Sequence, residues 1–336
     1  PREVAEANPY FQGDEKIVML EFTIDGLEVL EIEKDERFVN NDLNNTPVLT
    51  IPVDYKQYKC AEDEFGDCTN KEEEDSDLTW DQKEYFYPDY AALEVKELNM
   101  LDLSNVEGSG CVTAKGVKLV DYEFSKEGVL NIELEKTYKL RNTWSCIRRN
   151  YFMGKLSFNS FKVRFFYSMV ALDKLATKGY EKSEYAIENH STFGFFKDEI
   201  ETLNDDFDSN RKEVTYLANR WDPNKKVLTY YLSKSFNSEQ NKPILEATMR
   251  SQEVMNANLA SAGVGFKIQF LQQSESDNIS PGDLRYNTVV LIDDPLANGL
   301  LGYAPTVTNP ETGEIVQGHI NMYGGVLSSG TRWVYE

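Results

Sequence analysis

An imidazole is the side chain that most often carries acid–base or zinc chemistry near neutral pH, so the histidines are the first candidates for catalysis. The chain contains only His190 and His319. Neither lies in H-E-x-x-H, the motif that places two imidazoles one helical turn apart on one metal ion and supplies a Glu as base. A lone histidine is more often a hydrogen-bonded structural residue than a ligand. We therefore assign neither histidine a catalytic or metal-binding role.

Other catalytic signatures are also absent from the sequence. There is no G-x-S-x-G for a hydrolase nucleophile, no glycine-rich phosphate-binding loop and no Asp-Thr-Gly or Asp-Ser-Gly. The many carboxylates could form a glycosidase pair, but the sequence does not show which of them lie close together. The chain alone is predicted to be inactive, without catalytic residues, metal ligands or a cofactor.

Four cysteines offer a different chemistry. An even number suits two disulfides, for which three connectivities exist. Pairing of neighbours is the simplest, and the alternatives are free buried thiols or a metal site, although no C-x-x-C is present. Disulfides would place the protein in an oxidising compartment, so we expect a secreted, periplasmic or cell-surface location. The predicted disulfide residues are Cys60, Cys68, Cys111 and Cys146.

The most informative segment is residues 283–325. It contains Asp-x-Arg-Tyr at 283–286, Gly-Tyr-Ala-Pro-Thr-Val at 302–307 and Asn-Pro-Glu-Thr-Gly-Glu-Ile at 309–315. The last of these is a turn by composition, because Pro fixes φ and Gly permits positive φ. A hairpin joining 303–308 to 314–321 is therefore predicted.

These three motifs resemble a group of bacterial zinc-dependent metalloproteases related to the metzincins. The upstream strand and helix, 226–261, fall in the order expected of that group, and Phe193–Phe196 followed by Asn219–Asp222 also look similar. The specific match covers about the last third of the chain, and residues 1–190 match only weakly.

In such proteases this region is the sheet in front of the active-site helix, and its outer strand pairs with an extended substrate through main-chain hydrogen bonds. The resemblance implies that 314–321 or 303–308 is that outer strand. The zinc helix, H-E-x-x-H-x-x-G-x-x-H, would come later, so we expect the natural protein to continue past Glu336 and zinc only in a longer form. The candidate substrate-binding residues are Glu314, Ile315, Val316, Gln317, Gly318, His319 and Ile320.

The elements that would position this segment fall into two groups. Up to about residue 200, apolar alternation and turn signals such as Asp25–Gly26 and Glu127–Gly128 favour short strands. The acidic stretch from Cys60 to about Asp77 is interpreted as a solvated loop rather than a calcium site. Residues 201–210 are likewise interpreted as a linker or turn rather than a calcium loop.

After this linker the pattern changes. Strand patterns occur at 226–232, 266–271 and 288–292, and a helix is predicted from Pro243 to about Ser261. We predict an α+β protein with a mainly-β, sandwich or barrel-like accessory domain at 1–200. A partial α/β domain at 211–336 would follow, resembling the N-terminal half of a metzincin catalytic domain.

Composition limits the partners. Lys and Arg number 35 and Asp and Glu number 57, so the net charge is 35 − 57 = −22. A surface this acidic repels phosphate backbones and is otherwise typical of a soluble protein, so no nucleic-acid partner is expected. No apolar run of spanning length occurs, so no membrane span is expected. The oligomeric state is not indicated.

Three functional hypotheses follow. The first is the N-terminal, non-catalytic portion of a secreted zinc metalloprotease-like protein, with a protein or peptide substrate for the full-length form. The second is a non-catalytic surface binding or adhesion protein on a protease-like scaffold. The third is an unrelated surface protein whose turn motifs match by chance. A downstream H-E-x-x-H would discriminate the first from the others.

Overall fold

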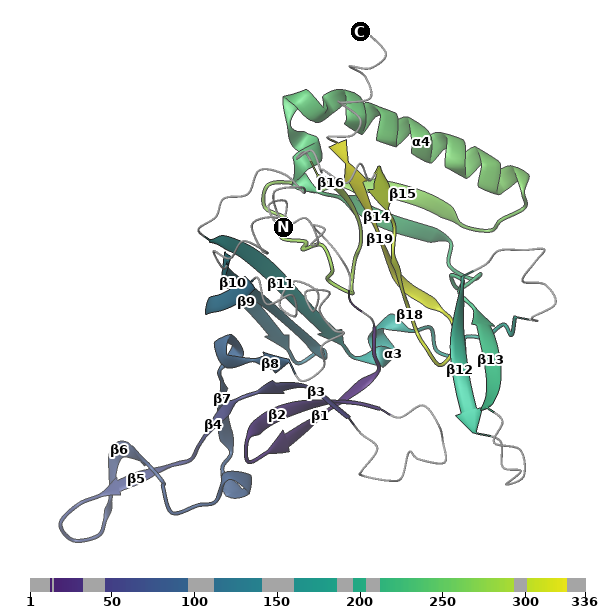
Figure 1. Cartoon of the computed structure of the whole chain (residues 1–336). Helices are drawn as coiled ribbons and strands as arrows, with labels where there is room; N and C mark the ends of the chain where they lie inside the picture. The colour runs from purple at the N-terminus through teal and green to yellow at the C-terminus, as the bar shows by residue number, and fades with distance from the viewer. Residues whose placement is uncertain are drawn as a thin grey trace. The chain divides into compact units, whose positions relative to one another are not determined.

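The computed structural model describes residues 13, 15–32, 46–95, 112–140, 160–185, 196–203, 212–292 and 301–324, which are mostly β-strand with one long helix (Figure 1). The described chain divides into two compact units. One contains residues 16–100 and 117–119, and the other contains the rest. Strands 112–125, 129–140 and 161–170 therefore belong largely to the same unit as the α/β layer, although the sequence grouped them with the N-terminal strands.

The smaller unit begins with the predicted hairpin at Asp25–Gly26. Gly26 has φ 139°, and a Cβ there would lie 2.3 Å from the carbonyl oxygen of Ile51, so only glycine fits. The strands of this unit form a four-stranded sheet, β1-β2-β3-β8, and two two-stranded ribbons, β4-β7 and β5-β6. They are β1 (Val18–Thr23), β2 (Gly26–Glu31), β3 (Thr46–Ile51), β4 (Val53–Lys56), β5 (Tyr58–Glu62), β6 (Cys68–Glu74), β7 (Tyr85–Pro88) and β8 (Glu94–Val95), with 3-10 turns η1 (Trp80–Gln82) and η2 (Tyr90–Ala92).

The acidic stretch 60–77 corrects a prediction. It is not a loop, because β5 and β6 form an antiparallel hairpin closed by a disulfide between Cys60 and Cys68. The hydroxyl of Thr69 also donates to the carbonyl of Ala61 across the hairpin at 2.6 Å. The disulfide and these cross-strand bonds hold the strands together despite the repulsion of like charges.

The larger unit contains a three-stranded antiparallel sheet in the order β11-β10-β9. The predicted turn at Glu127–Gly128 joins β9 to β10, with Gly128 at φ 81°. Val163 and Phe165 of β11 are buried, as their alternation predicts. A two-stranded ribbon follows, and residues 204–211, which include most of the predicted linker, lie outside the described chain. These elements are β9 (Val112–Ser125), β10 (Val129–Leu140), β11 (Phe161–Val170), α3 (Leu172–Leu175), β12 (Lys197–Leu203) and β13 (Lys212–Ala218).

The last sheet contains the strands and the helix that the sequence predicted after residue 211. Its order is β15-β14-β16-β19-β17, and β18 also pairs with β19. Strands β14, β15, β16 and β19 run parallel, whereas β17 and β18 run antiparallel to β19. The elements are β14 (Val227–Leu232), η5 (Lys234–Asn237), η6 (Glu239–Asn241), α4 (Lys242–Ser261), β15 (Lys267–Gln272), β16 (Asn287–Ile292), β17 (Gly302–Tyr303), β18 (Thr306–Thr308) and β19 (Ile315–Tyr323).

Helix α4 lies along one face of this sheet (Figure 1). It begins with Pro243 in its first turn and is followed by Gly263 at φ 73°, as predicted. The core beneath it is apolar and centres on Leu232, Phe236 and Phe270. None of the described helices combines the length and apolar character needed to cross a bilayer.

Replacing Phe236 with Ala tests this core. Phe236 is 1% exposed, so its loss should lower the free energy of unfolding by about 3–5 kcal/mol through lost burial and a residual cavity. The matched control is Phe196→Ala, because Phe196 is 83% exposed and should change stability by less than about 0.5 kcal/mol. Urea denaturation measures both. Equal effects of the two substitutions would contradict this packing.

Candidate functional site

Two of the segments that carry the resemblance meet in space. The amide of Arg220 donates to the carbonyl of Gly313 at 3.1 Å, and the amide of Ile315 donates to the carbonyl of Arg220 at 2.8 Å. The segment before β14 is thereby paired with the start of β19. Gly313 has φ 72°, and a Cβ there would lie 2.8 Å from the carbonyl oxygen of Ala218. The close approach of the two segments thus requires glycine at this turn.

Glu314 lies at the centre of this meeting point and is fully buried. Its carboxylate accepts hydrogen bonds from the amide of Thr177 at 2.8 Å and from the hydroxyl of Thr177 at 2.6 Å. The Nζ of Lys225 lies 3.8 Å away. A buried carboxylate is tolerated only when such donors replace water. The positions of the segments that contain Thr177, Lys225 and Glu314 are therefore coupled.

Asp222 is a second buried carboxylate beside it. The amide and side chain of Asn224 donate to it at 2.9 and 3.1 Å, and the hydroxyl of Thr177 lies 3.2 Å from it. Chiefly the backbone bond from Asn224 lowers the pKa of Asp222. Because the pKa of Asp222 is lower in the folded state, its ionised carboxylate stabilises the fold at pH values above the ordinary pKa of 3.8. This stabilisation is lost as the pH falls through the lower, folded-state pKa.

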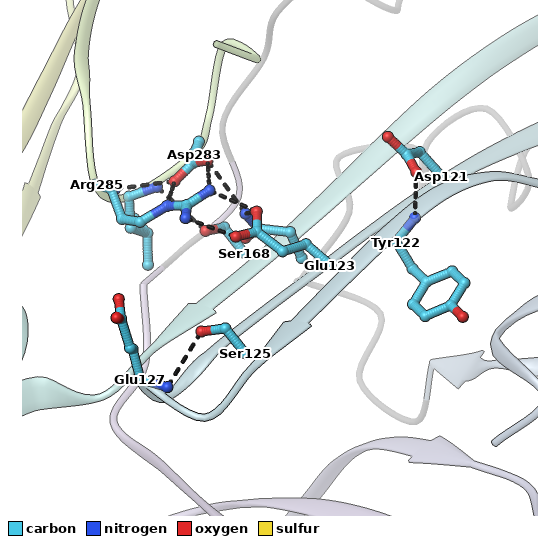
Figure 2. Close-up of polar contacts among 10 residues, drawn as sticks. Asp121, Tyr122, Glu123, Ser125, Glu127, Ser168, Asp283 and Arg285 are labelled. Carbon is cyan, nitrogen blue, oxygen red and sulfur yellow. Dashed lines mark hydrogen bonds and ion pairs between the residues drawn. The ribbon is translucent and has the colours of Figure 1, made fainter. Parts of the chain in front are cut away.

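The Asp-x-Arg-Tyr motif forms a separate cluster (Figure 2). Arg285 donates to both carboxylate oxygens of Glu123 at 2.7 and 2.6 Å, and to both of Asp283 at 3.0 and 2.7 Å. Bonds to Asp283, and next to Glu123, raise the pKa of Arg285 above its usual range. The guanidinium therefore stays charged and joins two carboxylates.

This cluster fastens the loop before β16 to every strand of the three-stranded sheet. Glu123 comes from β9. Asn131 of β10 donates to Asp283 at 3.1 Å, and Ser168 of β11 accepts from the amide of Leu284 at 3.1 Å. The cluster consequently fastens the loop before β16 to this sheet.

The position of β19 corrects another prediction. Residues 314–320 were predicted as the outer, substrate-pairing strand, but β19 is flanked by β16 on one side and by β17 and β18 on the other. Its backbone groups are already used in pairing with both neighbours. The physical reason is that 287–292, far away in sequence, supplies a parallel neighbour that no local pattern reveals.

The alternative outer strand, within 303–308, does lie at the sheet edge as β17 and β18. The outward-facing amide of Thr308 donates to the carboxylate of Glu15 at 3.0 Å, and so does its hydroxyl, also at 3.0 Å. One side chain from the N-terminal segment therefore occupies part of this edge.

The opposite edge of the sheet, β15, is closed by the helix. The side chain of Asn256 both accepts from the amide of Ile268 and donates to its carbonyl, each at 2.8 Å. The side chain of Gln252 accepts from the amide of Phe270. Because α4 uses these outward groups, the β15 edge is closed to a further strand.

Buried polar side chains alternate along β19. Gln317, His319 and Asn321 are at most 5% exposed, and the side-chain amide of Gln317 donates to the carbonyl of Tyr286 at 2.9 Å. On the other face Gly318 is close to Tyr230, whose pKa burial raises to about 12. His319 is thus an interior residue, and His190 lies outside the described residues.

Metal and sulfur chemistry are limited in the described ranges. Among these residues, no group of three or more His, Cys, Asp or Glu side chains is arranged to hold a metal ion. The disulfide joins Cys60 to Cys68, one of the predicted neighbour pairs. Cys111 and Cys146 lie outside the described residues.

Sequence reasoning missed three residues that complete these clusters. Thr177, Glu123 and Glu15 each bond a residue more than 130 positions away along the chain. An isolated Thr or Glu in an acidic sequence gives no signal of such a partner.

Comparison of the chain with protein-family models, curated proteins and solved structures found no match.

Replacing Asp283 with Asn tests the fastening. The new amide NH₂ would face donors of Arg285 and Asn131, and we expect a loss of about 1–3 kcal/mol in the free energy of unfolding. Asp121→Asn is the control, because this exposed residue on β9 loses the same charge and can still accept from the amide of Tyr122. Urea denaturation of both variants measures the difference. A loss for Asp121→Asn as large as that for Asp283→Asn would refute the role of the cluster.

Proposed function

We propose that this chain is the N-terminal, non-catalytic portion of a secreted zinc metalloprotease-like protein. The observation that carries the proposal is the edge of the α/β sheet. Antiparallel strands β17 and β18 lie outside β19, at the place where the resemblance expects the strand that pairs with substrate. The meeting of 219–222 with 309–315 is further support, because two segments of the resemblance form one structural unit.

In the proposed function, an extended peptide adds to the edge formed by β17 and β18. Main-chain hydrogen bonds would supply affinity, and alternate side chains would supply specificity. The peptide would compete with Glu15 for the amide of Thr308. The disulfide between Cys60 and Cys68 supports the secreted, periplasmic or cell-surface location in this proposal.

Chemistry is assigned to a downstream zinc helix and not to residues 1–336. We expect the coding sequence after Glu336 to contain H-E-x-x-H. The longer protein should hydrolyse casein, and Ala in place of the motif Glu should abolish hydrolysis but keep the fold, because that Glu is the base for zinc-bound water. Residues 1–336 alone should neither hydrolyse casein nor retain stoichiometric zinc after dialysis.

Two outcomes would contradict this proposal. A stop codon directly after Glu336 would remove the zinc helix from the protein. One tightly held zinc ion per chain in residues 1–336, measured by metal analysis, would mean that the ligands lie within this chain.

The second candidate is a non-catalytic binding or adhesion protein on a protease-like scaffold. An exposed aromatic surface in the smaller unit favours it, because soluble proteins seldom leave large apolar side chains clustered at the surface without a partner. Tyr85 and Tyr87, which are separated by one residue on β7, are 51% and 53% exposed. A stop codon after Glu336 would make this the leading candidate.

A further inference from the structure

The ribbon of β4 and β7 has two different faces. On one face Phe86 packs against Phe22 of β1 with ring centroids 4.8 Å apart, and Tyr55 lies next to Phe22 at 6.4 Å. The hydroxyl of Tyr55 donates to the carbonyl of Thr23 at 2.7 Å. This face anchors the ribbon to the first hairpin.

The other face carries Tyr85 and Tyr87 of β7, and Tyr58 of β5 lies against them. We call these three residues the tyrosine face. The rings of Tyr58 and Tyr85 lie 5.8 Å apart, and the hydroxyls of Tyr58 and Tyr87 lie 3.4 Å apart. The three residues are 39%, 51% and 53% exposed. Their mutual contacts order the rings in advance, so a partner would lose little side-chain entropy on binding them.

The surroundings of the tyrosine face are strongly acidic. Residues 54–77 contain ten acidic and three basic side chains, a net charge of 3 − 10 = −7. Lys56, the basic residue beside Tyr85, is already paired with Asp54 at 3.2 Å and Glu74 at 2.9 Å. The field at this face therefore attracts cations.

The acidic hairpin next to this face is held in place covalently. The disulfide between Cys60 and Cys68 closes β5 and β6 within a few residues of Tyr58. A two-stranded hairpin is at best marginally stable alone, so the disulfide keeps the carboxylates of β6 in a defined place relative to the tyrosines.

We propose that the tyrosine face binds a Lys- or Arg-rich segment of a partner protein. Exposed aromatic rings bind ammonium and guanidinium groups through cation–π contacts, and the neighbouring carboxylates complement the remaining positive charge. A second copy of this chain is a poor occupant, because two molecules of net charge −22 repel each other. This surface is separate from the sheet edge of the proposed function and does not depend on it.

The test measures binding of short fluorescein-labelled peptides to the full chain by fluorescence anisotropy. One peptide alternates arginine with serine, another lysine with serine, and a neutral one glutamine with serine. The arginine and lysine peptides should bind, with affinity that falls as salt rises, and the glutamine peptide should not. Tyr85→Ser with Tyr87→Ser should weaken binding about two- to fivefold for each ring, because each cation–π contact contributes about 0.5–1 kcal/mol.

Controls separate the rings from the net charge. Tyr122→Ser with Phe124→Ser removes two exposed aromatic rings from β9 and should leave the affinity unchanged. Tyr85→Phe with Tyr87→Phe keeps the rings and should bind within about twofold of the unmodified chain. Glu72→Gln with Glu73→Gln should weaken binding without altering the tyrosines.

Several results would overturn the proposal. Unchanged affinity in the serine pair would mean that net charge alone holds the peptide. Tight binding of soluble starch, lost in Tyr85→Ser with Tyr87→Ser and seen without any peptide binding, would also overturn it. The tyrosines would then form a carbohydrate-binding surface. Circular dichroism shows whether the double variant Tyr85→Ser with Tyr87→Ser folds. If it does not fold, loss of binding in Tyr85→Phe with Tyr87→Phe would overturn the proposal. Unchanged binding in Glu72→Gln with Glu73→Gln would overturn it as well.

Discussion

The arrangement of the last sheet depends on one buried carboxylate. Glu314 has no access to water, so it requires donors, and Thr177 supplies two from a segment that precedes the sheet in sequence. The backbone on either side of Glu314 is paired with Arg220. The turn before β19, the segment before β14 and the segment after α3 therefore hold one another in place, and with them the position of β18 at the sheet edge.

The Arg285 cluster fixes the loop before β16, the parallel neighbour of β19, in a similar way. It joins the loop before β16 to β9, β10 and β11, so the three-stranded sheet and the α/β sheet belong to one unit. In both clusters charged groups hold segments of the chain in position. The proposed recognition surfaces are the edge formed by β17 and β18 and, in the smaller unit, the tyrosine face.

What the sequence could predict follows from the range of each interaction. The turns at Gly26 and Gly128 and the limits of α4 depend on residues within a few positions, and they were predicted correctly. The hairpin of β18 with β19 was also predicted from its turn. The pairing of β19 with β16 and the donors to Glu314 depend on segments farther along the chain, and local patterns are silent about them. The stretch 60–77, which contains most of the β5–β6 hairpin, was predicted as a loop because its acidic composition is typical of a solvated loop. The sequence left open which cysteines pair, so it did not show that a disulfide closes this hairpin.

The most direct measurement of the central constraint is native-state hydrogen exchange at the β19 amides in Thr177→Val. This near-isosteric change removes the hydroxyl that Glu314 accepts, so we expect the free energy of opening at Ile315 to fall by about 1–3 kcal/mol. The control is Thr229→Val, at a half-buried residue of β14 in the same sheet. It should leave the free energy of opening at Ile315 within about 0.5 kcal/mol of that of the unmodified chain. Equal protection of Ile315 in Thr177→Val and in the unmodified chain would contradict the account.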